Sequence, residues 1–286
     1  MPDTTPDTTP DAGLRHVEHV MGTVFSFDIR DRPTPAIRRA LAHAVSELHT
    51  VDAVFSTYRP DSAISRLGRG EILLADCPPE VQEVLSLCAQ VTRVSDGWFS
   101  VMPAGALDPS GLVKGWATEY ASQLLHEAGA EHTCVNGGGD LQLRGRSAPG
   151  TPWRIGIAHP LRPGQLATVI TANANATADV TADAARTAKA ADDRFAIATS
   201  GTAERGPHIL DPHRAVPAMG LASVTVTGPG LTMTDAYATA AFARGESAYD
   251  WLESLDGYEA FAVRPDGSTW RTAGFSGEAP SLPTPS

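Results

Sequence analysis

The sequence predicts an α+β fold: one unit of two closely joined lobes, with mixed or antiparallel sheets and flanking helices. Strand-like and helical stretches follow one another without the regular β-α-β repeat of a doubly wound sheet. The 286 residues, 42% of them hydrophobic, are enough to bury a large core. The 22 basic and 33 acidic residues give a net charge of −11. Because no stretch concentrates lysine and arginine, the composition argues against a nucleic-acid partner.

The N-terminal half is expected to begin with strands and to continue with helices. Residues 17–29 alternate apolar and polar side chains, which predicts strands around a turn at Met21 and Gly22. Pro35 opens an amphipathic helix, because apolar residues recur every three or four positions after it. The same spacing predicts a second helix over 79–95.

A third helix is predicted over 114–129, where Gly129 is placed to form a left-handed C-terminal cap. The predicted buried stripe of this helix comprises Trp116, Tyr120, Leu124 and Leu125.

The second half of the chain is interrupted by a segment of simple composition. Residues 171–193 are almost all Ala, Thr, Asp and Asn, which predicts an inserted loop. Strands are expected over 195–198 and 223–226. Residues 234–243 predict a helix with Asp235 in its first turn.

The two ends are predicted to be disordered tails, 1–13 and 276–286, around a folded domain of residues 14–275. The start shows neither the basic and apolar regions of a signal peptide nor a lipoprotein anchor, and we therefore expect a cytoplasmic protein. No run approaches the roughly 20 apolar residues of a membrane helix. The three cysteines favour neither a disulfide framework nor a zinc site, because their number is odd and their spacings are unrelated.

Residues 108–115 contain glycines and Lys114 directly before the third predicted helix. Glycines allow close approach of a backbone to phosphate, and a helix start offers free N–H groups. A phosphate site and an ordinary turn both fit this segment, since the pattern of a Walker loop is absent.

A glycine triplet lies between two strand-like runs at 135–141. A hairpin turn explains the Asn-Gly pair. Three successive glycines exceed what a hairpin needs, and they indicate that this backbone passes close to a ligand or to another backbone.

Two further clusters carry polar residues suited to catalysis. His208 and Asp211 can orient each other, and a histidine can accept a hydroxyl proton near neutral pH; a purely structural histidine is the alternative. Ser200 lacks the surroundings of a hydrolase nucleophile. Asp235 and Thr239 lie one helical turn apart and present two hard oxygen donors suited to Mg²⁺. A capping Asp and a back-bonded Thr are the alternative there.

In this order, the clusters resemble the FAD:protein FMN transferase family, also called the ApbE family. The resemblance covers roughly residues 17–245 and is carried by a succession of short motifs. These motifs occupy residues 21–23, 55–62, 64–67, 96–99, 108–115, 136–140, 159–160, 198–201, 208–212 and 235–239.

The resemblance implies that the chain transfers FMN from FAD to a Thr or Ser hydroxyl of an acceptor protein, through a phosphoester bond and with release of AMP. FAD would lie in a cleft between two lobes. Flavin- and adenine-contacting positions would be Met21, Tyr58, Trp98, Phe99, Ser100, Asp108, Lys114 and Ile209. Mg²⁺ would be held by the Gly111 carbonyl, Asp235, Thr239 and the FAD pyrophosphate. His208, supported by Asp211, would be the base for the acceptor hydroxyl.

Three positions depart from the family pattern: Gly68 replaces an Asn, Ser100 replaces an Asp, and Glu119 is the acidic residue that ends the lysine motif. The change at Gly68 is expected to open the pocket wall, which would favour attack by water. An FAD diphosphatase that releases FMN and AMP is therefore an alternative function. A non-catalytic FAD-binding module is another, although such a module would not require a metal pair.

Overall fold

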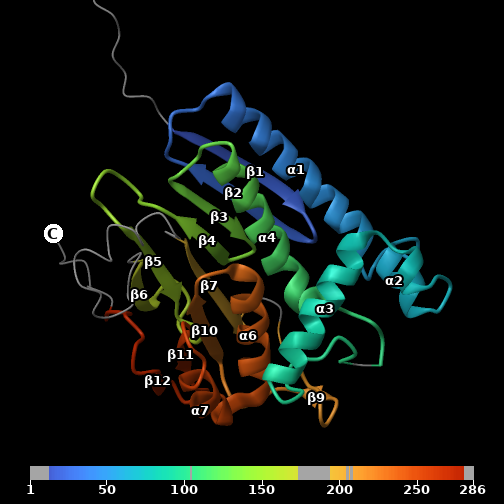
Figure 1. Cartoon of the computed structure of the whole chain (residues 1–286). Coiled ribbons are helices and arrows are strands. Elements are labelled where there is room, and N and C mark those ends of the chain that lie inside the picture. Colours follow the sequence, from blue (N-terminus) through green and yellow to red (C-terminus); the bar gives the residue numbers. More distant parts are fainter. Residues whose placement is uncertain (1–12, 104, 173–193, 204–205, 207–208, 280–286) are drawn as a thin grey trace, which may run out of the picture.

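The computed structural model describes residues 13–103, 105–172, 194–203, 206 and 209–279. Its centre is an eight-stranded sheet in the order β1-β2-β3-β4-β7-β10-β11-β12, with antiparallel pairing throughout (Figure 1). The strands are β1 (Leu14–Val20), β2 (Thr23–Ile29), β3 (Thr133–Gly137), β4 (Asp140–Arg144), β7 (Arg194–Gly201), β10 (Ser223–Gly228), β11 (Glu259–Val263) and β12 (Thr269–Arg271). Two hairpins stand apart, β5 (Trp153–Ala158) with β6 (Leu166–Ala172) and β8 (Leu210–Asp211) with β9 (Val216–Pro217).

Three long helices lie over one face of the sheet: α1, α4 and α6 (Figure 1). Their bounds are Pro35–Phe55, Ser110–Glu127 and Leu231–Arg244. The other helical elements are α2 (Ala63–Gly68), η1 (Leu74–Asp76), α3 (Pro79–Val94), η2 (Gly245–Ser247) and α7 (Ala248–Glu253). The predicted α+β class with antiparallel sheets is confirmed.

The two faces of the sheet bury separate hydrophobic clusters. The larger cluster lies between the sheet and the helices and contains Phe25, Phe27 and Leu125. The smaller one contains Leu143 and Ile197, which face the β5–β6 hairpin. This division follows from the alternation of side chains along each strand.

The predicted strand pair and the first two helices are confirmed. Met21 and Gly22 form the turn between β1 and β2, and both have positive φ, +56° and +67°. This backbone matches the twist of a two-residue hairpin. Pro35 occupies the first turn of α1, where its missing N–H is not needed, and the Thr34 hydroxyl accepts the Ile37 N–H at 3.2 Å.

The third helix differs from its prediction at its start and on its buried side. α4 begins at Ser110, four residues earlier than expected, and ends before Gly129, which has the predicted left-handed φ of +91°. Tyr120 is 38% exposed and was wrongly assigned to the buried stripe, whereas Ala117 and Ala121 are buried. The reason is that α4 packs against α1, α6 and β3, so small residues on several sides become buried.

Helix α6 also begins earlier than predicted, at Leu231, so that Asp235 lies in its second turn and not in its first. The 171–193 prediction is wrong for Thr171 and Ala172, which complete β6, and 173–193 lie outside the described residues. The predicted tail 276–286 starts too early, because Glu278 and Val169 exchange backbone hydrogen bonds of 2.9 and 3.0 Å. No helix among the described residues is long and apolar enough to cross a bilayer.

Candidate active site

Helices α4 and α6 run antiparallel at close range, and glycines on α4 permit this approach (Figure 1). A Cβ atom at Gly115 would lie 2.7 Å from the Asp235 Cβ atom, which is closer than real side chains come. A Cβ atom at Gly111 would lie 3.3 Å from Thr239 Cγ2. The four-residue spacing on each helix therefore matches, and Gly111 and Gly115 face Thr239 and Asp235.

We call the contact of Gly111 and Gly115 with Thr239 and Asp235 the α4–α6 junction. Lys114 connects this junction to the sheet. Its Nζ donates to Asp235 Oδ2 at 2.9 Å and to Asp140 Oδ2. The Gly115 N–H donates to the same Asp235 oxygen at 3.0 Å, and Asp140 Oδ1 accepts the Thr199 N–H at 2.8 Å. Only 19% of the Lys114 side chain and 6–7% of the two carboxylate side chains are exposed. Three residues far apart in sequence thus form one buried charge cluster.

Burial governs the titration of this cluster. It raises the pKa of Asp235 to about 7, against the opposing effect of the Lys114 ammonium, and the charge of Asp140 adds to the increase. Burial alone would lower the pKa of Lys114, but the two carboxylates outweigh it and raise that pKa above its ordinary value. Lys114 is therefore protonated, and two acids share one cation.

The glycine triplet forms the hairpin between β3 and β4. Gly138 and Gly139 have φ of +61° and +97°, and the Asn136 Oδ1 accepts the Gly139 N–H at 2.8 Å. A side chain at Gly137 would overlap Thr118, and a Cβ atom at Gly138 would lie 2.6 Å from Thr23 Oγ1. The close neighbours of Gly137 and Gly138 are therefore side chains of the chain itself, whereas the sequence predicted a ligand or another backbone.

The turn between β8 and β9 places Asp211 beside an aromatic pair. Asp211 Oδ1 accepts the backbone N–H groups of His213 at 2.9 Å and Arg214 at 3.2 Å, so this carboxylate stabilises the turn. His213 packs edge-on against Trp98, with ring centroids 4.6 Å apart. His208 lies outside the described residues.

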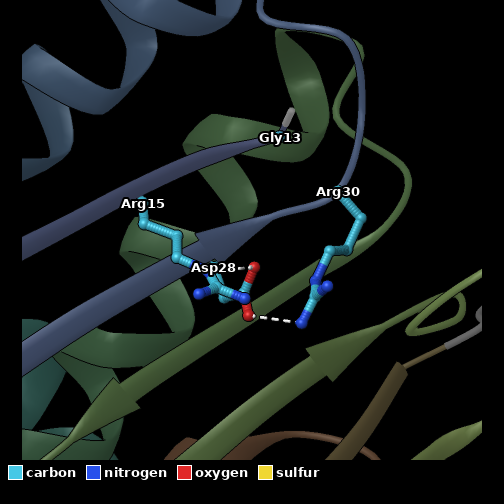
Figure 2. A pocket seen from close by; sticks show the side chains of 4 residues that line it. All are labelled: Gly13, Arg15, Asp28 and Arg30. Atoms are coloured by element: carbon cyan, nitrogen blue, oxygen red, sulfur yellow. Dashed lines mark hydrogen bonds and ion pairs between the residues drawn. The ribbon is translucent and has the colours of Figure 1, made fainter. Parts of the chain in front are cut away.

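A separate pocket of about 420 Å³ lies beside β1 and β2, at the end of the sheet (Figure 2). Gly13, Arg15, Asp28 and Arg30 line it. Arg30 Nη2 contacts Asp28 Oδ2 at 2.7 Å, and the Arg30 guanidinium lies 5.4 Å from the Trp153 ring centroid. None of the predicted site residues lines this pocket.

The model of the ApbE family matches residues 21–106 and 102–262, most of the chain. The chain belongs to the ApbE family. It is 29% identical over 217 residues to the FAD:protein FMN transferase of Rhodobacter capsulatus, a match that covers 69% of this chain and 38% of that relative. The enzyme of the same name from Haemophilus influenzae is 27% identical over 146 residues, 51% of this chain and 39% of the relative. The chain thus spans about two fifths of the length of these relatives.

Solved ApbE structures share the fold. The ApbE protein of Thermotoga maritima gives a TM-score of 0.74 at 19% identity, covering 91% of this chain and 97% of that one. The apo flavinyl transferase ApbE of Pseudomonas stutzeri gives 0.73 at 23% identity, covering 91% and 94%. At these identities, the likeness concerns the fold.

The residues predicted to contact flavin and adenine lie in several different environments. Phe99 is buried and would lie 3.2 Å from a Cβ atom at Gly111, so it supports the start of α4. Tyr58 is 96% exposed. Asp108 Oδ1 accepts the Ser110 N–H at 2.9 Å and thereby caps α4. Met21, Trp98 and Ile209 are partly buried against the main core, and Ser100 Oγ accepts the Met102 N–H at 3.0 Å.

Lys114 lies one turn inside α4 and is paired with two carboxylates. Its charge is therefore shared by Asp140 and Asp235, and its contact with FAD stays a prediction.

The donor set at the α4–α6 junction fits Mg²⁺. Both contacts of Asp235 use Oδ2, and no donor among the described residues contacts Oδ1. Thr239 is half-buried on the same helix face. The Gly115 N–H, one turn after the Gly111 carbonyl, donates to Asp235 and so ties two of the predicted ligand residues to the same turn of α4. Within the described ranges no three His, Cys, Asp or Glu side chains converge as a metal cage, so phosphate and water would complete the shell.

Asp140 is the site residue that sequence reasoning did not assign. It ends the glycine-containing motif at 136–140, and it contacts both Lys114 and β7. An acidic residue that follows a tight turn and opens a buried strand is the signal that could have indicated it.

Proposed function

We propose that this chain is a Mg²⁺-dependent FAD:protein FMN transferase, which attaches FMN to a Thr or Ser hydroxyl of an acceptor protein and releases AMP. The observation that carries the proposal is the α4–α6 junction, where Gly111 and Gly115 face Thr239 and Asp235 beside Lys114. The names of the relatives support the reaction class.

In the proposed reaction, the acceptor hydroxyl oxygen forms a bond to the FMN phosphorus of FAD. The bond from this phosphorus to the bridging oxygen breaks, and AMP leaves with that oxygen. The hydroxyl proton passes to a base, for which His208 remains the prediction, while Asp211 fixes the turn that follows it.

The residues of the junction would hold Mg²⁺ through the Gly111 carbonyl, the Asp235 carboxylate and the Thr239 hydroxyl. When bound, the ion would supply charge stabilisation for the departing phosphate. Lys114 orients Asp235 and favours its ionised form, since the ammonium opposes the effect of burial on that carboxylate.

The test combines purified protein, FAD, Mg²⁺ and an acceptor with the motif Asp-x-x-[Ser/Thr]-Gly-Ala-[Ser/Thr]. The acceptor should gain the mass of FMN, and an equal amount of AMP should appear. Equal AMP release without acceptor would instead identify a diphosphatase, and stable FAD binding without AMP would identify a binding module.

The structure removes one argument for hydrolysis. The opening expected beside Gly68 is filled, because the Leu107 Cβ atom would lie 3.1 Å from a Cβ atom at position 68. Transfer to a protein hydroxyl is therefore the function we propose.

A further inference from the structure

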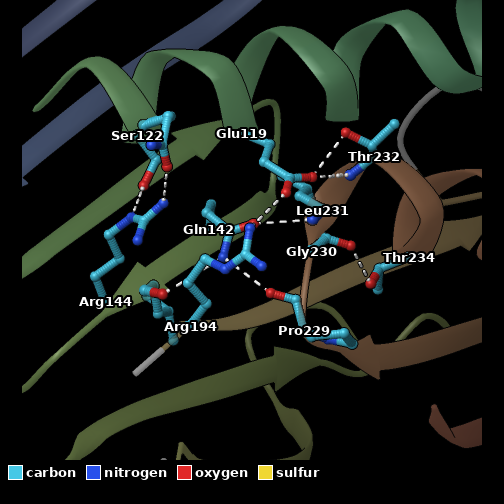
Figure 3. Close-up of polar contacts among 12 residues, drawn as sticks. Glu119, Ser122, Gln142, Arg144, Arg194, Pro229, Gly230, Leu231, Thr232 and Thr234 are labelled. Carbon is cyan, nitrogen blue, oxygen red and sulfur yellow. Dashed lines mark hydrogen bonds and ion pairs between the residues drawn. The ribbon is translucent and has the colours of Figure 1, made fainter. Parts of the chain in front are cut away.

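Helix α6 carries the proposed metal ligands but has no N-terminal cap of its own. Its N-cap residue is Gly230, which offers no side chain. Gln142 Oε1, from β4, accepts the Leu231 N–H at 2.8 Å. Glu119 Oε2, from α4, accepts the Thr232 N–H at 2.9 Å and the Thr232 hydroxyl at 2.7 Å (Figure 3). The first two N–H groups of α6 are thus satisfied by other elements.

Both capping side chains are themselves held in place. Glu119 Oε1 accepts from Arg194 of β7 at 3.2 Å, and Gln142 is fully buried in the sheet (Figure 3). A Cβ atom at Gly230 would lie 2.7 Å from Glu119 Oε1, so a larger residue would make this carboxylate shift.

The caps and the metal ligands lie on the same interface. Glu119 follows Gly115 by one turn of α4, and Gly115 packs against Asp235 and donates its N–H to that carboxylate. Asp235 lies one turn after the capped Leu231. Fraying of the first turn of α6 would therefore release the backbone that sets the position of Asp235.

We infer that Glu119 and Gln142 are positioning residues, which hold the start of α6 and thereby place Asp235 and Thr239 against Gly111. This inference rests on the proposed function for the role of the two ligands. The capping contacts themselves do not depend on it.

Hydrogen exchange in the segment 229–236 tests the caps without any metal. Glu119→Ala and Gln142→Leu should each accelerate exchange there about five- to tenfold, the factor expected for loss of one helix-capping interaction. Glu119→Gln keeps an acceptor oxygen for Thr232 and should stay close to the unmodified protein. Ser122→Ala is the matched control, because it removes a hydrogen bond to Arg144 in the same polar layer without touching α6 (Figure 3).

Titration of AMP release with Mg²⁺ tests the positioning role. Glu119→Ala and Gln142→Leu should need about fivefold more Mg²⁺ for half-maximal rate, with kcat at saturating Mg²⁺ near that of the unmodified enzyme. Glu119→Gln should restore the ordinary Mg²⁺ requirement, and it serves as the folded test case if the Ala variant does not fold.

Three outcomes would overturn the inference in different ways. Unchanged exchange would show that these side chains do not hold the start of α6. Faster exchange with an unchanged Mg²⁺ requirement would show that the caps only stabilise the helix. An unmodified enzyme that releases AMP equally well without Mg²⁺ would refute the proposed metal centre, and with it the positioning role, whatever the exchange data show.

Discussion

Two regions of this ApbE protein combine acidic and basic side chains, and they differ chiefly in burial. At the β1–β2 pocket, Asp28 contacts Arg15 and Arg30, whose side chains are 72% and 37% exposed (Figure 2). At the α4–α6 junction, Lys114 and its two carboxylates are almost enclosed. Water screens the charges of the first group, so removal of one partner costs little free energy of folding. In the second group, removal of one charge leaves the others unpaired in a medium that solvates them poorly.

The comparison shows that residue type alone does not mark a site. Both regions offer carboxylates and cations. At the junction, burial raises the pKa of Asp235, and hard oxygen donors point at one place.

Lys114→Met should reduce the free energy of unfolding by about 3–5 kcal/mol, because it leaves Asp140 and Asp235 buried without their cation. Urea unfolding measured at neutral pH checks this. A loss below about 1 kcal/mol, typical of exposed pairs, would mean that water reaches the cluster freely.

Asp235→Ala should lower the rate of AMP release on the order of 10²-fold or more, since it removes the only carboxylate of the proposed metal set. The measurement is AMP formation at saturating FAD and Mg²⁺, on protein whose folding is verified by circular dichroism. Asp28→Ala is the matched control from the exposed pocket and should retain the ordinary rate. Undiminished release by Asp235→Ala would disprove the metal assignment.

Gly115→Ala should destabilise the protein by about 1–3 kcal/mol, because the added methyl group would force α4 and α6 apart. Gly111→Ala should have a smaller effect, since its nearest contacts would be 3.2–3.3 Å, compared with 2.6–2.7 Å at Gly115. The midpoint temperature of thermal unfolding, measured for both variants, shows which substitution destabilises the protein more. The reverse order would contradict the helix contact described above.

Arg30→Met should change the free energy of unfolding by only about 0–1 kcal/mol, because its pair with Asp28 is exposed to water. Added salt should reduce even this difference. Urea unfolding at two ionic strengths measures it. A loss as large as that of Lys114→Met would remove the contrast between the two regions.

Local sequence patterns were sufficient for several elements and for one pair of site residues. The alternation in 17–29 and the helical spacing after Pro35 each depend on neighbours a few positions away, and the structure confirms both elements. Asp235 and Thr239 share a helix face for the same local reason, whatever the rest of the fold does.

Periodicity failed where a helix is covered on several sides. The stripe predicted for α4 assumed one buried face, and Tyr120 was misplaced because α1, α6 and the sheet all pack against this helix. Likewise, the start of α6 lacked a local signal, since its caps come from Glu119 and Gln142, 89 to 113 residues away in sequence.

Backbone geometry and short-range spacing make three features predictable from the chain: the first strand pair, the long helices and the local pairing of Asp235 with Thr239. Packing of the helices on the sheet is what makes Gly111 and Gly115 face that pair, lets Asp140 share Lys114 with Asp235, and caps α6 from other elements. These contacts join residues that are distant in the chain, and they exist only when the helices pack on the sheet.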